Sequence, residues 1–106
     1  MDIADWRGQI DKLDQQLVEL INKRAECALE IGRLKRNSDM PVYEPDRERI
    51  IFDNIARNNA GPLSTMQLRQ IFERLVDVMR QIQRDEMVAE NAKLSGNGVT
   101  ELEPKD

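Results

Sequence analysis

The sequence contains no histidine, one cysteine and only 4% aromatic residues in a chain of 106. Without histidine it lacks the commonest general base and the commonest metal ligand, so a zinc site or a serine triad has too few residues. The single cysteine, Cys27, excludes an internal disulfide. An enzyme built from this chain would therefore work by positioning its substrate and by fixed charge, without a metal or another cofactor.

Long apolar runs and a surplus of basic residues are also absent. No stretch approaches the roughly 18 apolar residues of a membrane span, and the start, MDIADWRG, lacks the basic and apolar regions of an export signal. The net charge is −4, and no basic stripe is interleaved with aromatic residues. We therefore expect a cytoplasmic protein that binds neither a membrane nor nucleic acid.

The first third of the chain carries a regular apolar pattern. On a seven-residue repeat, nine of the ten residues at the two seam positions are apolar, and the tenth is Arg24. This pattern predicts a long helix from about Asp2, as its N-cap, to Arg36. Such a helix would be about 50 Å long, whereas a compact chain of this size has a radius of gyration of only about 13 Å. A second copy must cover the excess seam, so we predict a homodimer.

The rest of the chain predicts two further helices. One should run from about residue 45 to residue 58, after an extended connection bracketed by two prolines, and the turn sequence NNAGP should end it. The next should begin at a capping box of Ser64 and Gln67. These long, short and long helices make residues 1–94 an all-α domain, and we expect residues 95–106 to be a disordered acidic tail.

Five charged or amide side chains interrupt or border the apolar faces. Arg24 occupies a seam position, where burial of a guanidinium is costly unless an anion meets it. Lys35 lies eleven residues further on, nearly three turns, so both cations project in about the same direction. Arg47 and Glu48 border the apolar face of the second helix, and Gln83 lies on the apolar stripe of the third. The set suits a small dianion that also carries a hydroxyl and an ether-like oxygen.

Each of these residues also has a purely structural interpretation. Arg24 can snorkel out of the seam or specify its register, and Lys35 can interact with the helix dipole. Glu48 can be a helix-start acid paired with Arg47, and Gln83 can form a hydrogen bond across a subunit seam. The functional interpretation therefore depends on the whole set and not on any single member.

The sequence resembles the all-helical class of chorismate mutases from about residue 3 to residue 86. The order and spacing of short motifs carry the resemblance: WRGQID followed by LD, NKR, IG followed by Lys35, PVYEPDRE, and Gln83 eleven places after Phe72. That family converts chorismate into prephenate on the way to phenylalanine and tyrosine, without a cofactor. The resemblance implies an intertwined homodimer of three-helix chains with two active sites.

By this resemblance the cations would bind the two carboxylates of the substrate. Arg24 would hold one carboxylate, Arg7 would reach the other from the partner subunit, and Arg47 would help to place them. Glu44 stands where the family usually has aspartate. Because the family's contact there can come from the main-chain N–H, we expect the longer acid to be tolerated.

The other matching residues would act on the reacting part of the substrate. Lys35 and Gln83 would donate hydrogen bonds to the ether oxygen of the breaking bond, and Glu48 would take the ring hydroxyl. Met79 departs from the family, which often has a small hydroxyl residue at that position. One missing ligand hydrogen bond would weaken substrate binding by about 1 kcal/mol.

Three other functions stay open at this point. An isochorismate pyruvate lyase is built on the same fold, but the Arg47–Glu48 pair favours the mutase, because we expect the lyase pattern to lack that carboxylate. A non-catalytic helical dimerisation or regulatory module, or a plain coiled-coil adaptor, would not need the full set of polar residues. Such an adaptor would tolerate Arg24→Leu or become more stable.

Overall fold

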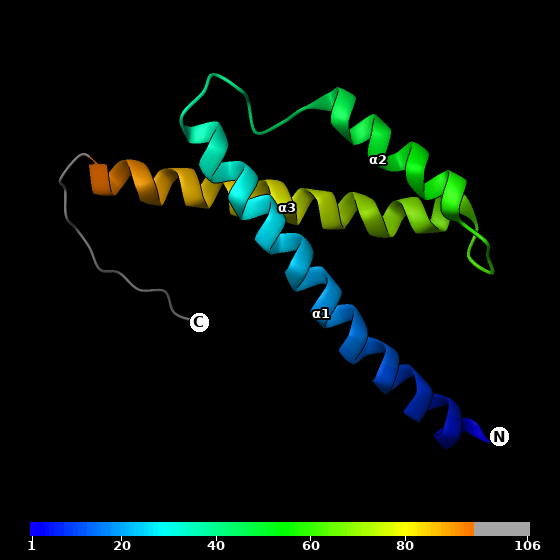
Figure 1. The fold of residues 1–106 in the computed structure, drawn as a ribbon. Coiled ribbons are helices and arrows are strands. Elements are labelled where there is room, and N and C mark those ends of the chain that lie inside the picture. Colours follow the sequence, from blue (N-terminus) through cyan, green and yellow to red (C-terminus); the bar gives the residue numbers. More distant parts are fainter. Residues whose placement is uncertain (95–106) are drawn as a thin grey trace.

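The computed structural model describes residues 1–94 and consists of three α-helices (Figure 1). The helices are α1 (Ile3–Arg36), α2 (Pro45–Asn58) and α3 (Thr65–Leu94), and no strand occurs in this part of the chain. The predicted all-α fold and its order of long, short and long helices are therefore confirmed. The predicted tail, residues 95–106, lies outside the described residues.

Local side-chain signals set the beginnings of the helices. At α1 the Asp2 side chain accepts a hydrogen bond from the Asp5 N–H at 2.9 Å, while the Asp5 side chain accepts one from the Asp2 N–H at 3.1 Å. Ser64 and Gln67 form the same reciprocal pair at α3, at 3.0 and 3.1 Å. α2 begins with Pro45, whose missing N–H costs nothing in a first turn.

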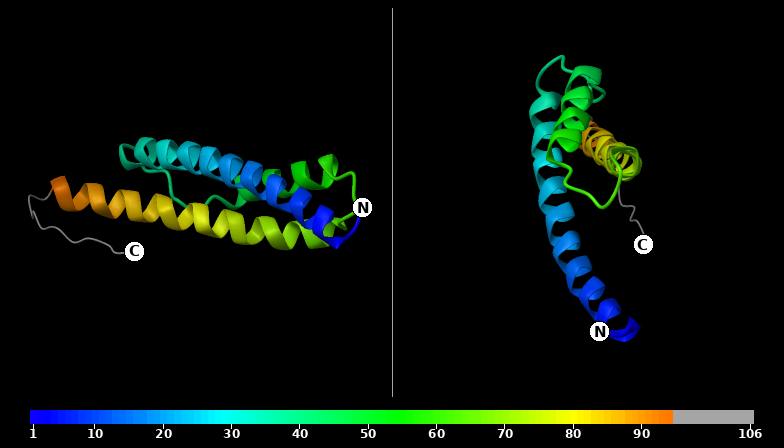
Figure 2. Two further views of the ribbon diagram at one scale, coloured as in Figure 1. Left: turned by 90° about the horizontal axis from the view of Figure 1, so that it is seen from below. Right: turned by 90° about the vertical axis from the view of Figure 1, so that its right-hand side faces the viewer.

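α3 is the helix against which the other two pack. The C-terminal half of α1 crosses α3, and α2 lies along the N-terminal half of α3 (Figures 1 and 2). Among the residues whose burial the structure describes, few apolar side chains are buried, namely Ala28, Ile55, Val76 and Met79. So small a core contributes little hydrophobic stabilisation to a single chain of this length.

The N-terminal half of α1 extends away from the rest of the chain (Figure 2). All residues from 1 to 23 are exposed, and these include the apolar seam residues Ile3, Trp6, Ile10, Leu13, Leu17 and Leu20. The radius of gyration is accordingly 17.9 Å, larger than the compact value of about 13 Å. No helix of the described chain is long and apolar enough to cross a membrane. One chain therefore leaves a continuous apolar stripe in contact with water.

Candidate active site

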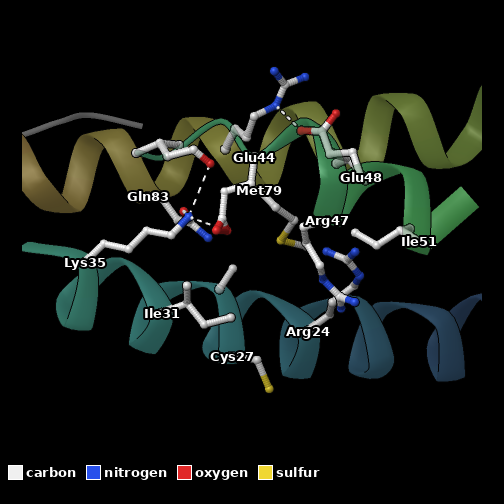
Figure 3. Close-up of a pocket in the computed structure, with 14 residues that line it drawn as sticks. Arg24, Cys27, Ile31, Lys35, Glu44, Arg47, Glu48, Ile51, Met79 and Gln83 are labelled. Atoms are coloured by element: carbon white, nitrogen blue, oxygen red, sulfur yellow. Dashed lines mark hydrogen bonds and ion pairs between the residues drawn. The ribbon is translucent and has the colours of Figure 1, made fainter. Parts of the chain in front are cut away.

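A cavity of about 200 Å³ lies where α1, α2, α3 and the connection between α1 and α2 meet (Figure 3). Six of the seven site residues predicted from the sequence line it: Arg24, Lys35, Glu44, Arg47, Glu48 and Gln83. The wall between them is mainly apolar, and it is formed by Ala28, Ile31, Val42, Ile51, Val76 and Met79. A few polar groups on an apolar wall are typical of a site for a small molecule.

Lys35 and Gln83 meet at one end of this cavity, where their side chains are only 5% and 8% exposed. Lys35 Nζ donates hydrogen bonds to Gln83 Oε1 at 3.4 Å and to the Val42 carbonyl at 3.3 Å. Because Gln83 accepts through its oxygen, its Nε2 group keeps its hydrogens for another acceptor. An ammonium and an amide N–H placed side by side can both donate to one ligand oxygen.

Glu44 also turns its carboxylate toward this ammonium (Figure 3). Glu44 Oε2 lies 3.4 Å from Lys35 Nζ, and the side chain is partly buried. From the sequence we expected the longer acid to be tolerated here because the contact can come from the main chain, and in the structure the Glu44 side chain itself also reaches the site. Its negative charge offsets part of the Lys35 charge.

Arg24 and Arg47 place two guanidinium groups side by side at the other end of the cavity (Figure 3). Neither forms an ion pair within the described residues. Burial, together with the nearby charge of Arg47, lowers the pKa of Arg24. A guanidinium stays protonated at any working pH, so the lowered pKa reflects how unfavourable the Arg24 charge is at this place. A ligand carboxylate bound here would offset the positive charge of both guanidinium groups.

Glu48 lines the α2 side of the cavity, and its partner was missed by the sequence analysis. Glu48 Oε2 is 3.2 Å from Arg80 Nε, and the Arg80 guanidinium lies 5.1 Å from the centroid of the Tyr43 ring. The sequence suggested the neighbouring Arg47 as the alternative partner of Glu48, but the structure pairs Glu48 with α3 instead. The spacing along α3 could have indicated that Arg80 lies near the site, because it precedes Gln83 by one helical turn and so lies on the same face of the helix.

Arg7 is the one predicted site residue that does not line the cavity. It is exposed on the free half of α1, seventeen residues before Arg24 and hence about 25 Å away along the helix. It cannot reach the cavity of its own chain. Its expected contact with a partner subunit stays a prediction.

The arrangement can bind and polarise a ligand more readily than it can attack one. Within the described residues, no three His, Cys, Asp or Glu side chains are grouped to hold a metal ion. The cavity instead has hydrogen-bond donors at one end and two guanidinium groups at the other, and the Glu48 carboxylate lies on its α2 side (Figure 3). Such a site can hold a dianion and stabilise negative charge that grows on one of its oxygens.

Comparison with known proteins identifies relatives of this chain. The family model for chorismate mutase type II matches residues 6–84. A bifunctional chorismate mutase/prephenate dehydratase from Aquifex aeolicus is 38% identical over 58 residues, which cover 55% of this chain and 16% of that protein. The T-protein of Haemophilus influenzae is 32% identical over 89 residues, which cover 84% of this chain and 22% of that protein. The chain thus spans about a fifth of the length of these relatives.

A solved structure is similar over a larger share of its own length. It is the crystal structure of chorismate mutase from Helicobacter pylori in complex with prephenate, which has a TM-score of 0.74 and 29% sequence identity to this chain. The match covers 80% of this chain and 92% of that one. Together with the family model, which covers well over half of the sequence, this likeness leads to one conclusion. The chain belongs to the chorismate mutase type II family.

Proposed function

We propose that this chain is a chorismate mutase, which converts chorismate into prephenate by an intramolecular rearrangement. The observation that carries the proposal is the meeting of buried Lys35 and Gln83 in one cavity with the guanidinium groups of Arg24 and Arg47. Family membership and the likeness to a complex with prephenate support this substrate class. We expect the enzyme to work in the cytoplasm, where its lone cysteine stays reduced.

The rearrangement is unimolecular and pericyclic, so it needs no nucleophile, general base, metal or cofactor. Its barrier falls when the enolpyruvyl arm is held over the ring and when donors meet the ether oxygen as that oxygen gains negative charge. Arg24 and Arg47 would hold carboxylates in the reactive conformer, and Glu48 would accept a hydrogen bond from the ring hydroxyl. Lys35 and Gln83 would donate to the ether oxygen. A millionfold acceleration requires about 8 kcal/mol from these effects together.

We further propose that the enzyme is an intertwined homodimer. The apolar seam along residues 3–20 of α1 is exposed in one chain, and a second copy would remove it from water. Burial of each large aliphatic side chain contributes about 1.5–3 kcal/mol, so such a seam can hold two chains together. Arg7, near the free end of α1, would then supply a cation to the partner's cavity and bind the second carboxylate.

An assay of the purified chain with chorismate, together with its mass in solution, tests this proposal. We expect loss of the ultraviolet absorbance of chorismate and formation of prephenate by a protein of twice the chain mass. Isochorismate is the control substrate, since release of pyruvate from it would support a lyase and contradict the mutase. A folded dimer that turns over neither substrate would support a non-catalytic module instead.

The pH dependence of kcat tests whether an amide donates to the ether oxygen. Gln83 donates without taking a proton from solution, so we expect kcat to stay constant from about pH 5 to above neutral pH. A Gln83→Glu variant is the matched control, because its carboxyl can donate only when protonated and its kcat should fall as the pH rises. A wild-type kcat that falls with an apparent pKa of about 5 to 6 would show that another group is the donor.

Gly32 lets the backbone of α1 approach Gln83 closely. Substitutions at Gly32 therefore test whether the position of the Gln83 amide is critical for activity. A Cβ atom at Gly32 would lie 3.4 Å from Gln83 Cγ and 3.5 Å from Gln83 Cα, which is ordinary contact distance. We therefore expect Gly32→Ala to keep its activity. Its free energy of unfolding should rise by up to about 1 kcal/mol, because alanine is the better helix former.

Gly32→Val should behave differently, because its methyl groups extend beyond Cβ toward Gln83. We expect displacement of the amide and a fall in kcat of about tenfold or more, consistent with the strong dependence of such donors on position. Steady-state kinetics and thermal unfolding of the two variants provide the comparison. Equal kcat values for the alanine and valine variants would show that the position of Gln83 is not critical.

A further inference from the structure

Arg80 lines the cavity, but the reaction as described above assigns it no role. Its Nε atom is buried and lies 3.2 Å from Glu48 Oε2, although the two atoms are not aligned for a hydrogen bond. Its guanidinium packs over the Tyr43 ring, and a second nitrogen lies 3.7 Å from the surface carboxylate of Asp77. Arg80 thus links the α1–α2 connection, α2 and α3 at the edge of the site.

The balance of charges in the cavity gives Arg80 a function. The lining contains four cations and two carboxylates: Arg24, Lys35, Arg47, Arg80, Glu44 and Glu48. Their formal charges sum to +2, which is the charge that a dianionic ligand requires. Glu48 adds to the cavity lining a charge of the same sign as such a ligand, and the nearby Arg80 guanidinium offsets this charge from the side of α3.

The geometry of the pair also restricts the orientation of Glu48. A glutamate side chain rotates about several bonds, so a carboxylate that must accept a hydrogen bond from a ring hydroxyl needs support. Arg80 lies beside Oε2, which leaves Oε1 as the acceptor. Arg47 does not provide this support, because its guanidinium lies beside Arg24 (Figure 3).

We propose, on the basis of the function proposed above, that Arg80 is a positioning residue for Glu48. Its guanidinium holds the carboxylate in the orientation that accepts the substrate hydroxyl and reduces the repulsion between that carboxylate and the dianion. The Tyr43 ring packed against the guanidinium limits its motion. Arg80 therefore acts on the substrate through Glu48 and not by direct contact.

A double-mutant cycle of Arg80→Met, Glu48→Gln and the double variant tests this role. We expect Arg80→Met to lower kcat/KM for chorismate about ten- to hundredfold in the wild-type background, but less than about threefold when residue 48 is glutamine. Calorimetric titration with prephenate should show the same dependence on Glu48. Arg84→Met is the matched control, because it removes the same charge from an exposed position one turn later on α3. Its kcat/KM should stay within about twofold of the wild type.

Equal losses from Arg80→Met in both backgrounds would overturn the inference, because Arg80 would then act without Glu48. Wild-type kinetics for Arg80→Met would overturn it as well. Arg80→Lys retains the charge and serves if the methionine variant does not fold, and we expect it to recover part of kcat/KM only when Glu48 is present. A wild-type chain that fails to turn over chorismate would refute the proposed function itself, so the two failures can be told apart.

Discussion

Replacement of Lys35 by methionine is expected to lower kcat for chorismate by about two to three orders of magnitude. Removal of one preorganised donor to a developing negative charge commonly costs about 3 kcal/mol. Lys35 fits this role because it is buried, donates to Gln83 and carries a full charge beside the cavity. Methionine fills a similar volume without the ammonium, and initial rates at saturating chorismate measure the effect.

Lys12→Met provides the control for this experiment. Lys12 is exposed on α1, lies at neither seam position and does not line the cavity, so its replacement removes the same charge outside the site. We expect its kcat to match that of the wild type. A Lys35→Met enzyme whose kcat stays within about threefold of the wild type would contradict the assignment of the ether-oxygen donors.

Replacement of Arg24 by leucine should separate activity from stability. Burial and Arg47 lower the pKa of Arg24, which means that folding disfavours the charged form of this residue. The charge therefore opposes folding at every pH below the folded-state pKa, a range that includes all working conditions. Leucine also restores the apolar seam of α1. We expect an unchanged or higher melting temperature for Arg24→Leu.

The same substitution should nearly abolish turnover, because it removes the cation proposed to hold one substrate carboxylate. We expect kcat/KM to fall by about a hundredfold or more, the scale of a lost hydrogen bond between charged groups. Calorimetric unfolding and steady-state kinetics on one sample measure both effects. Full activity in the leucine variant would contradict a substrate-binding role for Arg24. A more stable leucine variant of a wild-type chain that shows no turnover would agree with a coiled-coil adaptor.

The helices could be predicted from the sequence because their signals are local. The heptad pattern and Asp2 define α1, and the pair of Ser64 and Gln67 defines the start of α3. Proline at position 45 is also a local signal, and it marks the start of α2. Each signal involves residues within a few positions of one another, so no knowledge of the tertiary packing was needed.

The site was predictable only in part, because its details depend on how the helices cross. Five polar residues that border the core could be listed from their spacing, and Glu44 came from the family resemblance; all six line one cavity. The pairing of Glu48 with Arg80 depends on the packing of α2 against α3, which no local pattern encodes. Likewise, the approach of the Glu44 carboxylate to Lys35 follows from the path of the connection between α1 and α2.

The central claim, that two chains build each active site, is tested most directly by mixing two inactive variants. Arg7→Ala removes the group proposed to come from the partner, and Arg24→Ala removes a group supplied by the chain that forms the cavity. In a mixed dimer one site carries both substitutions and the other carries neither. Half of the dimers are mixed after the two chains are refolded together, so we predict recovery of about a quarter of the wild-type activity. A mixture as inactive as its two parents would contradict the shared site.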